Sequence, residues 1–421
     1  MRGTSFWRSR WGILLIVVLV LVVVAGLAAA WAWKKHQTHN VHGSAKTEFV
    51  STATPGHKRP RVIASELPWP TYGLDEQRSR LVFGTKVRPP YRTLWVYKAK
   101  SLLEFPPAIA YHYAYLPIER GIIRALEAWD GRVVWSRRFN ACIAASPAVA
   151  KGVVYESLLN PCDQPHDNKK GAVVALNAQT GKTVWRAEIG ATESSPLVVN
   201  GVVYVGSRNN RVYALDAKTG RVRWTYTTGG EVKGAGAYIA GTVYFGSYDG
   251  HVYALNARNG KLRWRASAES RLGGRGTFYA NPAIAYGRVY IGATDGVVYS
   301  FGATSGRLLW ARRTGGYVYS SAALWRRTVY VGSYDHHLYA IDAATGDVRW
   351  AFHANGAISG SPTVLNGVVY FSTLKARTYG LDALSGKVVW TFTDGYYSPI
   401  VADQRRAYLV GYARLFALRP R

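Results

Sequence analysis

A short phrase that ends in tryptophan recurs along the chain at a nearly constant spacing. Val212–Trp224 reads Val-Tyr-Ala-Leu-Asp-Ala-Lys-Thr-Gly-Arg-Val-Arg-Trp, and Val252–Trp264 and Leu338–Trp350 repeat it with few changes. Each phrase is typical of a strand, a tight turn and a second strand. An internal period of this kind indicates a repeat architecture, and it constrains the fold more than any other feature. The phrase-ending tryptophans are Trp95, Trp135, Trp185, Trp224, Trp264, Trp310, Trp350 and Trp390.

Two further strand signals separate each tryptophan from the next phrase. In the third unit they are Ser195–Asn200 and Gly201–Ser207, joined by an Asn-Gly pair that is typical of hairpin turns. Each unit therefore holds four antiparallel strands, A to D, with the tryptophan on D. This pattern predicts an all-β fold, an eight-bladed β-propeller of four-stranded antiparallel blades. Because the last unit lacks a D strand, we expect the lone first strand, Thr93–Tyr97, to complete it.

The phrase Ala-Leu-Asp-Ala-x-Thr-Gly-x-x-x-Trp resembles the repeat of PQQ-binding-like propellers, which include quinoprotein dehydrogenases and BamB-type outer-membrane assembly lipoproteins. Trp69–Asp75, followed by Arg78 and Arg80, also resembles the entry to such propellers. The resemblance covers residues 66–421 and implies that each repeat tryptophan docks between neighbouring blades. A large flat apolar side chain fills such a gap without any ligand.

The resemblance also bears on a cofactor. In the quinoprotein dehydrogenases, adjacent disulfide-bonded cysteines and a tryptophan sandwich the quinone, and carboxylate and amide groups bind calcium. The two cysteines of this chain, Cys142 and Cys162, are 20 residues apart. We therefore predict no catalytic residue, no metal ligand and no cofactor, because PQQ with calcium is not supported by this sequence.

The N-terminus carries an uncharged apolar run at residues 11–33, long enough to cross a bilayer as a helix. Basic residues flank it, and tryptophans stand at both ends as they do at membrane interfaces. We predict a short cytoplasmic N-terminus at 1–10, a transmembrane signal-anchor helix at 11–33, a flexible linker at 34–65 and the propeller at 66–421. A cleaved signal peptide is the alternative, since Ala28–Ala30 offers a cleavage site.

The predicted propeller has two unlike faces. Turns A–B and C–D form one, the turn face, and loops D–A and B–C form the other, the insertion face. Both insertions that stretch the period, 157–171 and 265–280, fall on the insertion face, where a repeat fold usually builds its binding sites. We propose as its binding residues Arg271, Arg275, Tyr317, Tyr319, Tyr396 and Tyr397. Small polar residues near the starts of the A strands are expected to line the axis: Ser146, Ser194, Ser195, Asn281, Ser320, Ser321, Ser361 and Ser398.

The two cysteines also fall on the insertion face. A disulfide between Cys142 and Cys162 is geometrically reasonable, and two free thiols are the alternative. A disulfide would indicate an oxidising, extracytoplasmic compartment.

Basic residues follow the C–D turn glycine in six of seven phrases. With a formal net charge of +29, they favour an anionic surface as partner, either lipid or a cell-wall polymer. Simple solvation of these side chains is the alternative, and we do not expect nucleic acid as the partner. The predicted ring is Arg132, Lys182, Arg221, Lys261, Arg307 and Lys387.

These observations favour a non-catalytic scaffold or sensor that binds an envelope protein. Its N-terminal helix would hold it in the plasma membrane by a single pass, with the propeller on the extracytoplasmic side. The alternative is an enzyme, either a PQQ-dependent oxidoreductase or a carbohydrate-active enzyme that uses the insertion face, because propellers host many functions.

Overall fold

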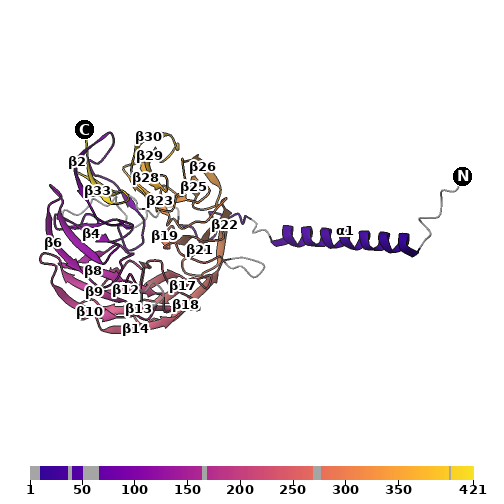
Figure 1. Ribbon diagram of the computed structural model, residues 1–421, viewed down its shortest axis with the longest axis horizontal. Helices are drawn as coiled ribbons and strands as arrows, with labels where there is room; N and C mark the ends of the chain where they lie inside the picture. Colours follow the sequence, from indigo (N-terminus) through magenta and orange to yellow (C-terminus); the bar gives the residue numbers. More distant parts are fainter. Residues whose placement is uncertain (1–9, 37–39, 51–65, 164–167, 269–275, 398–399) are drawn as a thin grey trace. The chain divides into compact units, whose positions relative to one another are not determined.

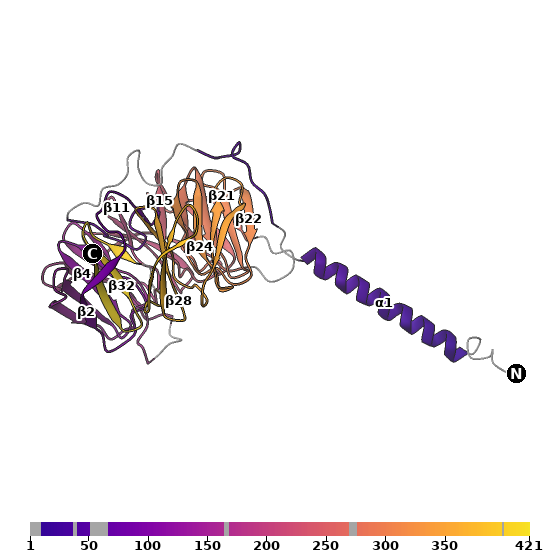
Figure 2. The same ribbon diagram turned by 90° about the horizontal axis from the view of Figure 1, so that it is seen from above.

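The computed structural model of the chain describes residues 10–36, 40–50, 66–163, 168–268, 276–397 and 400–421. Within the N-terminal helix it describes the side chains of residues 13–29. The propeller comprises eight sheets arranged radially in a ring, as Figure 1 shows. The ring turned by 90° shows its thickness, with β21 and β22 standing side by side in one blade (Figure 2). The predicted eight-bladed all-β propeller is therefore confirmed.

Each blade contains four antiparallel strands in the predicted order, from the axis outward. The A strands are β3 (Ala108–Ala110), β7 (Ala148–Ala150), β11 (Leu197–Val199), β15 (Ala237–Ile239), β19 (Ala283–Ala285), β23 (Ala323–Trp325), β27 (Thr363–Leu365) and β31 (Val401–Ala402). The B strands are β4 (Tyr113–Ile118), β8 (Val153–Leu158), β12 (Val202–Ser207), β16 (Thr242–Gly246), β20 (Arg288–Gly292), β24 (Thr328–Gly332), β28 (Val368–Thr373) and β32 (Ala407–Val410). The C strands are β5 (Ile122–Glu127), β9 (Ala172–Asn177), β13 (Arg211–Asp216), β17 (His251–Asn256), β21 (Val297–Gly302), β25 (His337–Asp342), β29 (Arg377–Asp382) and β33 (Arg414–Pro420). The D strands are β6 (Val133–Arg138), β10 (Thr183–Glu188), β14 (Val222–Thr227), β18 (Leu262–Ser267), β22 (Leu308–Arg313), β26 (Val348–His353), β30 (Val388–Phe392) and β2 (Tyr91–Lys98).

The ring is closed by its two ends. Strand β2 pairs antiparallel with β33, from Tyr91 opposite Pro420 to Lys98 opposite Arg414. The first strand of the propeller thus becomes the D strand of blade 8, as predicted. Numbered from β3–β6 as blade 1, the blades follow one another in chain order to blade 8, which is built from β31–β33 and β2.

The recurring phrase builds the contact between neighbouring blades. The Trp185 indole N–H donates to the carbonyl of Ala217 in the next blade at 3.0 Å, and the Tyr155 hydroxyl donates to the same carbonyl at 3.1 Å. Gly220 lies against the Trp185 ring with φ +74°, and a Cβ there would stand 2.7 Å from the ring. The phrase therefore needs its glycine for the left-handed turn and for the close approach of the indole. Equivalent indole contacts are made by Trp95, Trp135, Trp224, Trp264, Trp310 and Trp350.

Trp390 differs from the other repeat tryptophans. Its ring packs edge-on against Tyr91 at a centroid distance of 5.1 Å and also contacts Tyr370 and Phe392. Tyr370 in turn shares a 2.8 Å hydrogen bond with the Tyr91 hydroxyl. At the contact between blades 7 and 8, an aromatic group from the chain's entry thus takes the place of the usual turn carbonyl.

The segment that precedes β2 runs along the inside of the ring, from one A strand to the next. Its backbone bonds in turn to the middle residues of successive A strands, for example Trp69 with Ile109 and Gln77 with Ile284. It ends in β1 (Leu81–Val82), a fifth strand that pairs parallel to β27 and was not predicted. This axial segment, residues 66–82, places Arg78 and Arg80 at full burial inside the ring.

Residues 40–50 lie against blades 5 and 6. Val41 forms an isolated bridge with Ala311 in β22, and the Gly43 N–H donates to the carbonyl of Thr345 in a C–D turn. The buried Arg288 guanidinium donates to three backbone carbonyls between Ser44 and Glu48. This part of the predicted linker therefore reaches the propeller on the turn face.

The predicted N-terminal helix is present as α1 (Arg10–His36). Within the part of the chain that the structure describes, no helix is long and apolar enough to cross a membrane.

Candidate functional site

The insertion face converges on the axis through one position of the repeat. This position lies four residues before each A strand, and its eight residues surround the end of the axial passage that we call the mouth. Around the mouth, the residues from blades 1 to 4 are charged or small, and those from blades 5 to 8 are mainly aromatic. In blade order the residues are Glu104, Ala144, Glu193, Lys233, Tyr279, Tyr319, Ser359 and Tyr397.

Tyrosines pack against one another on the aromatic half of the mouth. The Tyr279 ring lies 5.2 Å from that of Tyr319 and 6.4 Å from that of Tyr248, measured between centroids. Tyr319 also contacts Tyr334 edge-on at 5.1 Å and Tyr317 at 5.8 Å. Tyr317 is 54% exposed. The tyrosine cluster thus continues from the buried mouth to the open surface.

A second tyrosine pair stands beside this cluster. Tyr396 and Tyr397 pack edge-on at 4.5 Å, and Tyr396 also meets the exposed Tyr412 at 5.7 Å. Burial raises the pKa of Tyr397, and the nearby Tyr396, Glu104 and Tyr334 raise it further. The structure therefore brings the four predicted tyrosines to one face, and Tyr397 is the link to the mouth. Arg271 and Arg275, also predicted here, lie outside the described residues.

Four alternating charges occupy the other half of the mouth. The Lys233 Nζ lies 3.2 Å from Glu231 and 3.8 Å from Glu193, and the Arg208 Nε lies 3.5 Å and 3.6 Å from the same two carboxylates. Lys233 also stands 4.5 Å above the centre of the Tyr248 ring. Asn168, from the 157–171 insertion, donates to Glu231 at 3.1 Å. The insertion thereby joins the mouth.

Burial shifts the carboxyl groups at the mouth. The pKa of Glu104 is raised to about 7, first by burial and then by the carboxylates of Glu193 and Glu119. The pKa of Glu193 is also raised, because burial outweighs the attraction of Lys233 and Arg208. A neutral Glu104 can donate a hydrogen bond, whereas an ionised one can only accept, so its hydrogen-bonding role changes near neutral pH.

The mouth is shallow because the axial segment blocks it. Below the ring lies a cavity of about 30 Å³ lined by Tyr72, Phe105, Glu193, Lys233, Tyr279 and other residues from blades 3 to 6. That space is large enough for only one or two water molecules. The predicted small polar residues tie the blades together here, since Ser195, Asn281, Ser321 and Ser361 each accept a hydrogen bond from a backbone N–H of another blade. Ser398 lies outside the described residues.

The predicted disulfide is confirmed. Cys142 and Cys162 are bonded, with 5.0 Å between their Cα atoms. The link ties a D–A loop to the start of the 157–171 insertion, and backbone bonds join Cys142 to Asn160 and Leu159. A groove beside the disulfide is lined by Glu119, Arg120, Arg138, Phe139, Asn140 and Asp163.

The predicted basic ring lies on the turn face. All six side chains are exposed on C–D turns: Arg132, Lys182, Arg221, Lys261, Arg307 and Lys387. The seventh equivalent residue, Asp347, is paired with His42 at 3.0 Å and Arg312 at 3.1 Å. Whether these cations meet an anionic surface stays a prediction.

Sequence reasoning missed most of the mouth. Glu104, Glu193, Lys233 and Tyr279 were not singled out, although one position of the repeat carries all four. Alignment of the units on the A strands would have found them. Tyr248 and Tyr334 lie on B–C turns and reach the mouth only through the fold.

Comparison with known proteins places the chain. The family model described as outer membrane protein assembly factor BamB matches residues 119–323 and 294–421, which is more than half of the chain. The chain belongs to this family. A BamB from Moranella endobia (strain PCIT) is 30% identical over 129 residues, 28% of this chain and 30% of that protein. The quinohemoprotein alcohol dehydrogenase ADH-IIG of Pseudomonas putida is 31% identical over 137 residues, 27% of this chain and 18% of that protein. This BamB-family chain thus matches about a third or less of the length of these relatives.

Solved structures agree on the fold. The quinohemoprotein alcohol dehydrogenase ADHIIG from Pseudomonas putida HK5 superposes with a TM-score of 0.73 at 14% identity, covering 84% of this chain and 80% of that one. BamB from Moraxella catarrhalis superposes with a TM-score of 0.66 at 17% identity, covering 78% and 99%. At these identities the likeness shows the propeller fold alone.

The mouth of this propeller does not fit a quinone cofactor. Its cysteines are joined across 20 residues of chain rather than as neighbours, and the axial cavity of about 30 Å³ is far smaller than a fused three-ring quinone. Among the described residues, no three or more His, Cys, Asp or Glu side chains are grouped to hold a metal ion.

Proposed function

We propose that the protein is a non-catalytic scaffold or sensor at the cell envelope, and that it binds a protein partner through its insertion face. The tyrosine cluster around the mouth carries this proposal. Tyr317 and Tyr412 are more than half exposed, and each ring packs against a partly buried tyrosine. Tyrosine is enriched at protein interfaces, and a side chain already held in place loses little freedom on binding.

The mouth supports binding better than catalysis. The axial segment leaves little room below the ring, so a partner would contact the rim rather than enter. The relatives named outer membrane protein assembly factors support a role with protein partners.

The partner surface is tested by photo-crosslinking in intact cells of the source organism. Full-length protein carries p-benzoylphenylalanine in place of Tyr317, and a control carries it in place of Leu384, which is 56% exposed on a C–D turn. We expect a defined protein adduct only from the Tyr317 position. The adduct is identified by mass spectrometry, and the purified partner is titrated against wild type and Tyr317→Ala. We expect about a tenfold loss of affinity, as for an interface hot spot. Equal adducts from both positions, or an unchanged affinity, would contradict the proposal.

We further propose that the apolar run at residues 11–33 anchors the protein in the plasma membrane, with the propeller outside the cytoplasm. The Cys142–Cys162 disulfide supports an oxidising compartment. The test is alkaline extraction of membranes from cells that make the full chain or a chain without residues 1–39. The full chain should stay in the membrane pellet, and release of both forms would refute the anchor.

We also propose that the basic ring faces an anionic lipid or cell-wall surface. Its six exposed cations and the approach of residues 40–50 to the turn face support this orientation. The test compares the wild-type full chain with a variant in which all six cations are changed to Gln, both in detergent-free nanodiscs. The variant should bind anionic liposomes more weakly than wild type. Unchanged co-sedimentation would exclude the ring as the contact.

An enzyme remains the competing hypothesis, and Glu104, with a pKa near neutrality, is the group that favours it. Incubation of the full chain with PQQ and calcium, followed by dye reduction with alcohols and sugars, separates the two. Turnover that Glu104→Gln abolishes would replace the scaffold proposal.

A further inference from the structure

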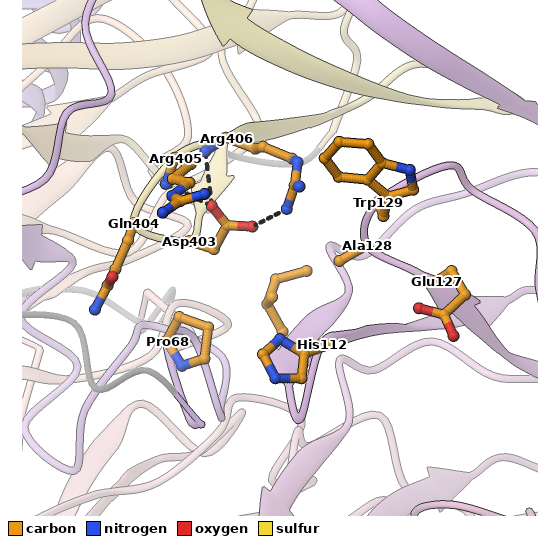
Figure 3. Close-up of a pocket in the computed structure, with 10 residues that line it drawn as sticks. Pro68, His112, Glu127, Ala128, Trp129, Asp403, Gln404, Arg405 and Arg406 are labelled. Atoms are coloured by element: carbon orange, nitrogen blue, oxygen red, sulfur yellow. Dashed lines mark hydrogen bonds and ion pairs between the residues drawn. The ribbon is translucent and has the colours of Figure 1, made fainter.

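A groove crosses the turn face where the ring closes between blades 8 and 1. The inner hollow, of about 480 Å³, includes Pro68 and Ile109, and the outer hollow, of about 640 Å³, includes Lys86 and Arg419. Trp129, Arg405 and Arg406 line both hollows. Figure 3 shows the inner hollow, with Trp129 and Arg406 on one side and Pro68 and His112 on the other. We call the two hollows together the seam groove.

Trp129 is the most unusual side chain of the seam groove. It is 73% exposed on the C–D turn of blade 1, where four of the other six phrases carry a polar residue, for example Gln179, and none carries an aromatic one. The Arg406 guanidinium lies 5.5 Å from the indole centre and is held by Asp403 at 3.1 Å. An exposed indole with a fixed cation beside it resembles an interface anchor more than a packing element.

Exposed cations without carboxylate partners lie in and beside the outer hollow. Lys86, Arg405 and Arg419 line it, and neither they nor the exposed Arg92 form an ion pair with a carboxylate of the described residues. Arg92 and Arg419 stand directly opposite each other across β2 and β33. Like charges at opposed positions of a sheet repel, and an anion between them would relieve this repulsion.

The acids of the seam groove are already engaged. Asp403 pairs with Arg406 and accepts the Tyr408 hydroxyl at 2.8 Å. Glu127 lies 3.7 Å from Arg132, and Asp130 accepts the Arg132 backbone N–H at 2.9 Å. The outer hollow is therefore cationic, whereas the inner hollow adds apolar walls from Pro68, Ile109 and Ala128.

We propose that the seam groove binds an extended acidic peptide segment of a protein partner. Trp129 would serve as its anchor, the inner hollow would take one apolar side chain, and carboxylates would lie between Arg92, Arg419 and Lys86. Trp and Arg dominate protein interface hot spots, which favours a peptide over a featureless polyanion. Strand β2 ends its sheet, so its outer edge offers backbone groups to an extended chain.

The seam groove is independent of the tyrosine cluster, because it lies on the opposite face. A propeller that binds one partner at each face would hold two proteins at a fixed separation. Failure of either site leaves the other testable.

Fluorescence anisotropy of the full-length protein tests the proposal. The probe is a fluorescein-labelled peptide, Asp-Glu-Asp-Phe-Glu-Asp, measured in low and in moderate salt. Variants are Trp129→Ala and the pair Arg92→Gln with Arg419→Gln. The matched control is the pair Lys218→Gln with Arg258→Gln, which removes the same charge from exposed C–D turn positions of blades 3 and 4 outside the basic ring.

We expect saturable binding by wild type, at least a tenfold loss in each groove variant and less than a twofold change in the control. Replacing the peptide's Phe by Gly should also weaken binding about tenfold. The thermal midpoint of the Arg92→Gln, Arg419→Gln pair should not fall, since a repulsion is removed. Absence of binding, or equal losses in the control pair, would overturn the proposal. Heparin serves as a polyanion without an apolar side chain. If the Gly peptide and heparin both bind as tightly as the Phe peptide, charge alone explains the binding and the proposal is overturned.

Discussion

Glu156 provides the sharpest test of the packing between blades. It lies in the middle of β8 and is fully buried, at a position where sister repeats carry Val205, Phe245 or Ile291. One carboxyl oxygen accepts the Ser157 backbone N–H at 2.9 Å, and the other has no hydrogen-bond partner among the described residues. Burial raises the pKa of Glu156 well above its ordinary value.

The sign of the pH effect follows from this direction. The unfolded chain releases the Glu156 proton near pH 4.3, whereas the folded chain keeps it until the raised pKa is reached. Between these two values the folded state binds one more proton, so the free energy of unfolding falls as pH rises. The loss is about 1.4 kcal/mol for each pH unit between the two pKa values. The stability that protonated Glu156 contributes is fully present below the pKa of Glu156 in the unfolded chain, and it is lost as the pH rises through the pKa of Glu156 in the folded chain.

The perturbation is Glu156→Leu, which restores the apolar side chain of the sister repeats. We expect the variant to gain stability over wild type as pH is raised from 4.5 to 8, at about 1.4 kcal/mol per pH unit until the folded pKa is passed. Denaturant unfolding followed by tryptophan fluorescence at each pH measures the difference. The control is Glu188→Gln, because Glu188 is 65% exposed and paired with Arg186. It should change stability by less than about 1 kcal/mol, without that slope.

Two results would refute this reasoning. A Glu156→Leu difference that does not vary with pH would mean that Glu156 is ionised when folded. A variant that is less stable than wild type at every pH would mean that the carboxyl group makes contacts that the packing does not reveal.

Three further predictions address the turns, the disulfide and the axis. Gly220→Ala and Gly201→Ala both place a side chain at φ +74°, but only at Gly220 would the Cβ meet an indole, at 2.7 Å. Denaturant unfolding should show a loss of about 1 kcal/mol in the free energy of unfolding at Gly201 and of about 2–4 kcal/mol at Gly220, and equal losses would exclude the indole contact. Cys142→Ser opens a link across 20 residues and should cost about 3 kcal/mol; reductant should remove the same amount from wild type and nothing from the variant. Arg80→Met removes a buried guanidinium whose main contact is the Tyr72 ring, 4.3 Å away, and whose nitrogens have no acceptor within hydrogen-bond geometry among the described residues; stability should stay equal or rise by about 1–4 kcal/mol. Arg78→Met loses a 2.8 Å bond to a backbone carbonyl and should destabilise, and the opposite order in thermal midpoints would contradict this account.

The fold could be predicted because its signals are local. The turn at Asp216 needs only neighbouring residues, since its carboxylate accepts the backbone N–H groups of Lys218 and Thr219 at 3.0 and 2.9 Å. Repetition of this turn fixes the number of blades, and the unpaired first strand fixes the closure. The disulfide was also within reach, because strand alternation places both cysteines on one face.

The candidate site was only partly within reach. Tyr317 and Tyr319 follow from their place on the insertion face, but the contact of Tyr319 with Tyr279 joins neighbouring blades, and both contact Tyr334 on a separate turn. Glu104 looks ordinary in the sequence, and its raised pKa depends on burial beside Glu193.

The sequence by itself determined the propeller, its eight blades, its closure and its two faces, because each follows from strand and turn signals within one unit of the repeat. Only the tertiary structure decided what stands at the centre and at the seam. The axial segment bonds to A strands that are far apart in the chain, and the seam groove brings Lys86, Trp129, Arg405 and Arg419 together from both ends of the propeller. Such contacts depend on the closed ring, and no local pattern encodes them.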